Sequence, residues 1–274
     1  MKAVCMILAV AGSATLLTGT AASGAVVTQW NFNGSDATSV PGGNNTPTPS
    51  TGSGSASLIG GTTASYASGI ASGGSTDPVT TSPANFGWGT TSYPAAAASN
   101  ETAGVQFLVS TSGYENITIS WDQRHSNTAS RFWAFYYTLD GSTWNRLGVS
   151  ASNATAGMTP SGGNPASTAG LFGPGGTFSA FDGSVSGSGD DWFNGRGVDL
   201  SSISGANDNP NFGFRIVSSF DNGAAYSASS GGSYATTGTS RFDMVTITGT
   251  QVPTPGATAL LGLGGLIAAR RRRD

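Results

Sequence analysis

The chain has 274 residues, of which only 9% are charged while 42 are glycine. Strong helix formers such as Glu and Lys are nearly absent, so we expect strands and turns rather than long surface helices. Between the two ends of the chain lie six arginines and thirteen acidic residues, which is not the basic surface of a nucleic-acid-binding protein. The only cysteine, Cys5, lies near the start, so the rest of the chain has no disulfide and no thiolate metal ligand.

The N-terminus predicts a signal peptide over residues 1–25. Lys2 precedes an apolar run over residues 3–17, and the small residues Ser23 and Ala25 occupy the positions that signal peptidase requires. We therefore expect a signal helix, export through the Sec machinery, and cleavage by signal peptidase.

Residues 26–251 are predicted to form one all-β domain, a β-sandwich of the jelly-roll type. Residues 34–103 are rich in Gly, Ser, Thr, Asn and Pro, which indicates long loops and short edge strands. Elsewhere bulky apolar residues alternate with polar ones or follow one another, a pattern typical of strands joined by Gly-rich loops. The strands predicted in this way cover residues 26–32, 105–109, 117–122, 131–139, 143–147, 212–216 and 241–248.

Few residues of this chain suit catalysis. His125 is the only histidine, and no nucleophile-elbow glycine pattern surrounds a serine. Glycoside hydrolysis needs two carboxyl groups across a cleft. The candidates are Glu101, Glu115 and the pair Asp190–Asp191, which we expect in an exposed Gly-rich turn beside Trp192. We therefore predict a non-catalytic protein, with a secreted hydrolase as the least favoured alternative.

The strand predicted over residues 131–139 is aromatic on both faces. Trp133, Phe135 and Tyr137 share one face, and the opposite face is aromatic as well. One face must belong to the core, while the other is either covered by loops or exposed as a platform for extracellular polysaccharide. Trp192 is a further candidate for such a platform.

Asp243 falls in the same alternation as Val245 and Ile247, which predicts that its carboxylate points into the core. A buried carboxylate has to be paired or coordinated. Pairing with Arg215 or Arg241 is one solution, and a structural Ca²⁺ ion with oxygen ligands is the alternative. No other cofactor is expected.

Residues 252–274 have the order of a membrane-sorting signal. The motif Val252-Pro253-Thr254-Pro255 is a stiff spacer that is unsuited to a helix. The uncharged residues 256–269 would form a helix of about 21 Å, a short transmembrane segment that snorkelling arginines can extend. A cluster that resists translocation ends the segment: Arg270, Arg271, Arg272 and Arg273.

This order closely resembles the PEP-CTERM sorting signal, the tag of exosortase substrates, although Thr254 stands where that family usually has glutamate. The resemblance implies transient anchoring in the inner membrane and cleavage by an exosortase, a membrane transpeptidase. The product would then reach the cell surface or the extracellular matrix of a biofilm.

Parts of the body are similar to a group of exported bacterial jelly-roll domains that often carry this tail. The resemblance implies fold and location but no chemistry. We expect a structural or adhesive surface protein, with an extracellular carbohydrate-binding module as the alternative. The similar segments are residues 122–131, 198–203, 209–216 and 241–245.

Overall fold

The computed structural model describes residues 24–33, 47–81, 85–148, 154–155, 171–172, 180–183, 185, 190–221 and 224–253. The predicted signal helix and the predicted transmembrane helix lie outside these residues. Within the described residues, no helix has the length and apolar character needed to cross a bilayer, and the helical structure is the short 3-10 turn η3 (Ser204–Ala206). The protein is all-β in the described ranges, as the composition predicts.

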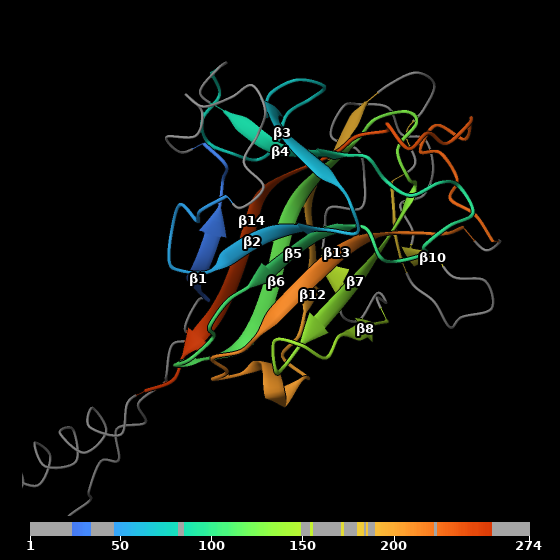
Figure 1. Cartoon of the computed structure of the whole chain (residues 1–274). Helices are drawn as coiled ribbons and strands as arrows, with labels where there is room; N and C mark the ends of the chain where they lie inside the picture. Colours follow the sequence, from blue (N-terminus) through green and yellow to red (C-terminus); the bar gives the residue numbers. More distant parts are fainter. Residues whose placement is uncertain are drawn as a thin grey trace, which may run out of the picture.

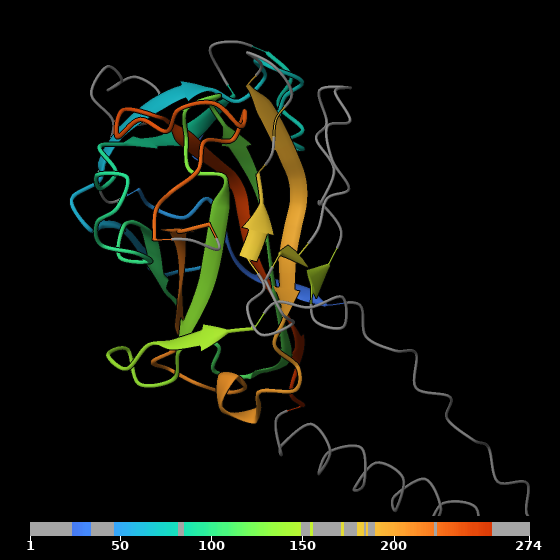
Figure 2. The ribbon, with the colours of Figure 1, turned by 90° about the vertical axis from the view of Figure 1, so that its right-hand side faces the viewer.

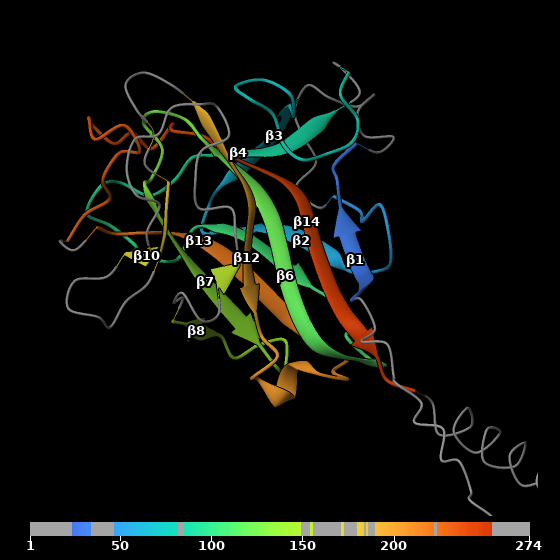
Figure 3. The ribbon, with the colours of Figure 1, turned by 180° about the vertical axis from the view of Figure 1, so that it is seen from behind.

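Sheet A runs in the order β3-β4-β14-β6-β12-β9, and β1 pairs with β14 beside β4 (Figure 3). Its strand pairs are antiparallel. The strands are β1 (Ala25–Trp30), β3 (Thr63–Ser68), β4 (Phe86–Thr91), β6 (Tyr114–His125), β9 (Ala154–Thr155), β12 (Asp191–Asp199) and β14 (Ser240–Gln251).

Sheet B runs in the order β10-β11-β7-β13-β5-β2, and β8 pairs with β7 beside β11. It too is antiparallel. The strands are β2 (Ser55–Ile59), β5 (Gly104–Leu108), β7 (Phe132–Thr138), β8 (Asn145–Leu147), β10 (Leu171–Phe172), β11 (Ala180–Asp182) and β13 (Gly213–Ser219). As the loop-rich composition of residues 34–103 predicts, β2 and β3 are short edge strands, whereas β4 from the same range lies inside sheet A between β3 and β14.

The two sheets pack face to face around an aromatic core (Figure 2). Trp121 of β6 stacks on Phe135 of β7 with ring centroids 5.9 Å apart, and Trp30 of β1 meets the edge of Phe107 of β5 at 5.0 Å. Aromatic side chains bury large apolar areas, so they supply most of the core in a chain whose other residues are mainly small. Of the six tryptophans, Trp144 alone is half-buried, while the buried ones are Trp30, Trp88, Trp121, Trp133 and Trp192.

The start and the end of this strand network lie side by side. β1 and β14 are antiparallel, with Ala25 opposite Gly249. The first residue of β1 and the last residues of β14 therefore lie at the same end of the molecule, which we call the tail end (Figure 1). Every strand that the structure describes falls between Ala25 and Gln251.

Strand β12 corrects the sequence analysis, which placed Asp190–Asp191 in an exposed turn. Asp191 instead begins a nine-residue strand that pairs with β6 along most of its length. The strand is hard to recognise in the sequence because it contains glycine and charged residues. One of its inward positions is Arg196, which is fully buried. A charged residue facing a core does not give the apolar alternation that marks a strand.

The loop between β3 and β4, residues 69–81, covers part of the outer face of sheet A, and we call it the capping loop. It is held by polar contacts with three strands of the sheet rather than by apolar packing. The contacts are those of Trp192 Nε1 with the Ala71 carbonyl (2.8 Å), Asn194 Nδ2 with the Gly74 carbonyl (2.9 Å), Arg124 Nη2 with Ser72 Oγ (3.2 Å) and Ser75 Oγ with Asp243 Oδ2 (2.6 Å).

Candidate functional site

The predicted aromatic platform is wrong for the residues proposed. Trp133 and Phe135 are fully buried because their face of β7 points into the core, where Trp133 contacts Phe242 at 5.8 Å between ring centroids. Tyr137 packs against the same core and is half-buried. Trp192 is also fully buried, since it lies under the capping loop. The rings of Trp133, Phe135 and Trp192 are therefore not accessible for stacking on a polysaccharide.

His125 lies inside the sandwich. Its ring packs between Trp133 and Phe193, with centroids 5.6 and 5.3 Å away. Its Nε2 accepts a hydrogen bond from Arg196 Nη1 at 2.9 Å. Burial, followed by the charges of Arg196 and Arg124, lowers the pKa of His125 well below its usual value. The imidazole is therefore neutral and has no contact with solvent, which makes it unsuitable as a general base for an external substrate.

Arg196 is a buried cation whose partners are neutral. It donates to Gln123 Oε1 at 2.8 Å and to the Asp182 carbonyl at 2.7 Å, in addition to His125. Its guanidinium carbon lies 4.3 Å from the centroid of the Phe193 ring, a cation–π distance. Burial lowers the pKa of Arg196 to about 9, so it remains charged at neutral pH. This cluster organises the core and offers no route to a ligand.

Three of the four carboxylates considered for glycoside hydrolysis are buried or held in ion pairs. Asp190 pairs with Arg124, and Asp191 is buried, so that burial and then the Asp190 charge raise the pKa of Asp191. Glu101 pairs with Arg146 at 2.9 Å and accepts a hydrogen bond from the Tyr136 hydroxyl at 2.5 Å. Glu115 is exposed on β6. Among the residues that the structure describes, no two of these groups face each other across a cleft, as hydrolysis requires.

Asp243 does not point into the core as the alternation predicts. The pairing of β14 with β6 slips between Asp243 and Thr246, and Met244 takes the left-handed conformation with φ 47°. This β-bulge reverses the faces, so Phe242 and Val245 both point inward while Asp243 lies on the outer face. Asp243 is nevertheless fully buried, because the capping loop covers it.

Neither arginine proposed as a partner of Asp243 forms an ion pair with it. Arg215 is on sheet B. Arg241 is near enough for the Asp243 charge to affect its pKa, but its guanidinium donates to the Ser68 carbonyl. The carboxylate of Asp243 instead accepts hydrogen bonds from the Ser75 hydroxyl and the Met244 amide. Two further buried carboxylates, Asp77 and Asp122, lie under or within the same loop. Neither was predicted from the sequence.

The outer face of sheet B carries a row of polar side chains that the sequence analysis also missed. Strand register places them opposite one another across β2, β5, β13, β7 and β8. We call this set the sheet B row: Ser57, Gln106, Arg215, Tyr136 and Arg146.

Arg215 is the centre of the sheet B row. It donates from Nε to Gln106 Oε1 at 2.8 Å, and its guanidinium carbon lies 3.8 Å from the centroid of the half-buried Trp144 ring. Among the described residues Arg215 forms no ion pair with a carboxylate. Partial burial lowers its pKa without removing its charge at neutral pH. Together with Trp144, the row thus presents a cation, an amide and an indole.

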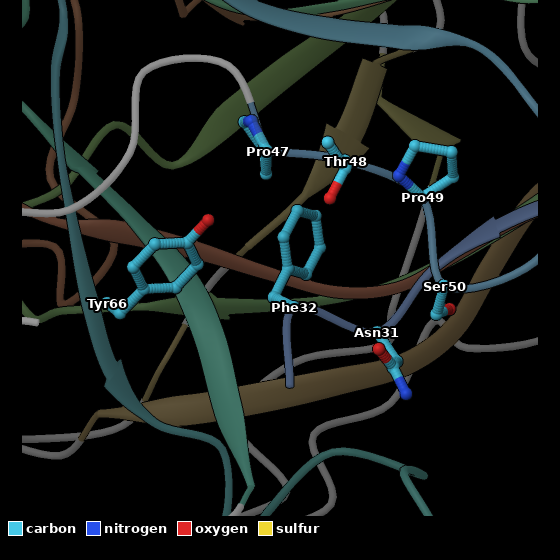
Figure 4. Close-up of a pocket in the computed structure, with 7 residues that line it drawn as sticks. All are labelled: Asn31, Phe32, Pro47, Thr48, Pro49, Ser50 and Tyr66. Carbon is cyan, nitrogen blue, oxygen red and sulfur yellow. The ribbon is translucent and has the colours of Figure 1, made fainter. Parts of the chain in front are cut away.

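A small cavity lies at the end of β1 (Figure 4). Its volume is about 50 Å³, enough for ordered water but far below the roughly 300 Å³ of typical ligand pockets. The Phe32 ring stands between Tyr66 and the segment that contains Pro47 and Pro49. The cavity is therefore too small to hold a sugar residue.

The residues of the predicted processing signals lie mostly outside the described ranges. Ala25 is the first residue of β1, and Val252 is exposed, with its amide bonded to the Gly113 carbonyl at 2.9 Å. Pro253 is the last residue described. The predicted signal residues outside the description are Ser23, Thr254, Pro255, Arg270, Arg271, Arg272 and Arg273.

Among the described residues, no three His, Cys, Asp or Glu side chains converge in the way a metal ion would need. A comparison of the chain with protein-family models finds no match, and neither does a comparison with curated proteins.

Proposed function

We propose that the protein is a non-catalytic component of the bacterial cell surface or extracellular matrix, exported as a jelly-roll-type β-sandwich and trimmed at both ends. In this proposal signal peptidase removes residues 1–25 and an exosortase cleaves near the motif at residues 252–255. The body is held briefly at the inner membrane by residues 256–273 and is then released to the surface or to a biofilm matrix.

One observation supports this proposal best: both ends of the strand network emerge at the tail end. Because β1 begins opposite the last residues of β14, the two predicted processing segments would be joined to neighbouring strands at one pole of the body. A chain tethered there would direct its opposite pole away from the membrane. Removal of both segments leaves the pairing of β14 with β4 and β6 intact and takes only Ala25 from β1.

The state of the candidate catalytic residues agrees with a non-catalytic role. His125 is neutral and buried, and Asp190 and Glu101 are held in ion pairs with arginine. Each group is therefore committed to stabilising the fold.

Cell fractionation of the producing bacterium tests the sorting step. A variant with the four changes Arg270→Gln, Arg271→Gln, Arg272→Gln and Arg273→Gln loses the charge that stops translocation, so it should escape unprocessed into the medium. The corresponding four-lysine variant keeps the charge and should be processed like the wild type. Equal processing of the glutamine variant would contradict the proposal.

Extracellular polysaccharide binding is a second candidate, and the sheet B row favours it. Arg215 supplies a cation without a carboxylate partner among the described residues, Gln106 supplies an amide, and Trp144 supplies an aromatic ring beside them. This chemistry suits a polysaccharide that carries carboxylate groups. Binding would serve adhesion within a matrix and requires no catalysis.

A further inference from the structure

Three carboxylates are buried together between the capping loop and sheet A. Asp122 and Asp243 are directly opposite each other on β6 and β14, and their exposed fractions are 1% and 0%. Asp77 of the capping loop is 5% exposed. Two consecutive loop residues donate hydrogen bonds to the carboxylates of the sheet. The Ser75 hydroxyl donates to Asp243 at 2.6 Å, and the Thr76 hydroxyl donates to Asp122 at 2.7 Å.

The charges of these carboxylates are not compensated by ion pairs, since none of the three forms one with a described residue. All six arginines of the body are described, and their hydrogen bonds go to other groups. Arg241 lies closest in charge terms, because the Asp243 charge opposes the lowering of its pKa by burial and by Arg124. Arg124, Arg131 and Arg146 pair with other acids, Arg196 lies in the core, Arg215 is on sheet B, and Arg241 bonds to the Ser68 carbonyl. Carboxylates withdrawn from water without such compensation carry a large free-energy penalty.

A second observation, an amide oxygen without a hydrogen-bond donor, indicates where a cation would bind. Asn85 is 1% exposed, and its Oδ1 accepts no hydrogen bond from any residue that the structure describes. Its Nδ2 donates to the Val79 carbonyl at 2.7 Å, which orients the amide. A Cβ atom on Gly69 would lie 1.6 Å from this Oδ1 and 3.1 Å from Asp243 Oδ2. Two buried acceptor oxygens thus border one point beside Gly69, and the Asn85 oxygen accepts no hydrogen bond from a described group.

The atoms around this point select a hard cation. They are carboxylate, amide and hydroxyl oxygens, and the single histidine is buried in the core away from them. Because no three acidic side chains converge here, a bound ion would need amide, hydroxyl and water oxygens as well. Ca²⁺ accepts six to eight such ligands in irregular geometry, whereas Mg²⁺ demands a regular octahedron and retains several waters.

We propose that Asp243 Oδ2 and Asn85 Oδ1 bind a Ca²⁺ ion beneath the capping loop, with Ser75 Oγ as the neighbouring oxygen ligand. The ion compensates the charge of Asp243 and, at longer range, that of Asp122 and Asp77. It joins β14 to the loop at Ser75 and to Asn85, which directly precedes β4, so calcium binding fixes the loop on sheet A. This site is independent of the sorting pathway and of the sheet B row.

Calorimetric titration of the full chain, purified in detergent with EGTA and then dialysed, tests the site with calcium chloride. Wild type should bind one equivalent of Ca²⁺, and saturating calcium should raise its Tm by about 5 °C. Asp243→Asn should lose binding, and Asn85→Leu should weaken it at least tenfold. The control Asp199→Asn, which removes a carboxylate elsewhere on sheet A, should bind like the wild type.

Asp243→Asn has a second expected signature, which distinguishes loss of a ligand from loss of the fold. Without calcium it should melt at the same temperature as the wild type or above it, because a buried charge has been removed. Wild-type protein that neither binds calcium nor gains thermal stability from it would overturn the proposal. Unchanged affinity in both Asp243→Asn and Asn85→Leu would overturn it as well.

Discussion

The Nε2 atom of His125 lies 2.9 Å from Nη1 of Arg196 in the core of the sandwich. A guanidinium group has no acceptor, so Nε2 must carry the lone pair and the imidazole proton must be on Nδ1. That Nδ1 has no hydrogen-bond partner among the described residues. Protonation of His125 would place two donors face to face and two charges together in the core. The contact therefore requires a neutral histidine.

The first prediction concerns the titration of His125. Its pKa is depressed by burial and by the neighbouring arginines. In a chain without an affinity tag, the imidazole C–H resonances should therefore not titrate between pH 7.5 and pH 5. Because the pKa is lower in the folded state than in the unfolded state, the stability linked to His125 is present above about pH 6.5 and is lost as the pH falls below it.

Urea unfolding at several pH values measures this loss. The wild type should lose up to about 1.4 kcal/mol per pH unit below pH 6.5 relative to His125→Gln, which has no group to titrate there. The carboxylates titrate in both proteins, so their contributions cancel in the difference between the two free energies of unfolding. A histidine resonance with a midpoint near pH 6.5 would contradict the assignment.

The second prediction concerns Arg196. Arg196→Ala leaves a cavity, leaves His125 Nε2 and the Asp182 carbonyl without their donor, and removes one of the two donors to Gln123 Oε1. We expect a loss of about 3–5 kcal/mol in the free energy of unfolding. Arg215→Ala removes the same side chain from a half-exposed position and should cost about 1 kcal/mol or less. Similar losses for both variants in urea titrations would contradict the structural role given to Arg196.

The third prediction concerns Gly69. A methyl group at this position would collide with Asn85 Oδ1 at 1.6 Å, so Gly69→Ala must displace the Asn85 amide. We expect a loss of about 1–3 kcal/mol, the usual range for overpacking a tight site. Gly148→Ala is the matched control, since nothing lies within 4 Å of its added Cβ, and it should change stability by less than about 0.5 kcal/mol. Equal thermal stability of the two variants would show that Asn85 is not held as described.

The fourth prediction concerns the sheet B row. If it binds an acidic polysaccharide such as alginate, Arg215→Gln and Trp144→Ala should each weaken binding about tenfold or more, and added salt should weaken wild-type binding. Thr118→Ala, on the outer face of sheet A, should bind like the wild type. Pull-down with immobilised alginate measures this, with melting curves to confirm folding. Binding that is unaffected by both row variants would remove the row as the site.

The sequence predicts the strands of this protein best where bulky residues alternate clearly. The inward face of β6, with Ile117, Ile119 and Trp121, is found as predicted. Strand β7 shows the limit of this reasoning. Because both of its faces are aromatic, alternation cannot decide which one enters the core, and the face of Trp133 proves to be the buried one.

The candidate sites were less predictable because they depend on events that are not local in the sequence. The bulge at Met244 moves Asp243 to the outer face, and a shift of one residue in a strand leaves no mark in composition. Asn85 and Asp243 lie beside the same residue, Gly69, because the capping loop folds back over sheet A. The sheet B row likewise arises from the register of five strands that are far apart in the chain.

The mass of the intact protein recovered from the surface or medium of the producing bacterium tests the central claim most directly. The proposal predicts a chain that begins at Val26 and lacks the terminal cluster Arg270–Arg273, with any attached group visible as added mass. Native extracellular protein that still contains residues 1–25 or the complete arginine cluster would contradict export and processing by the proposed route.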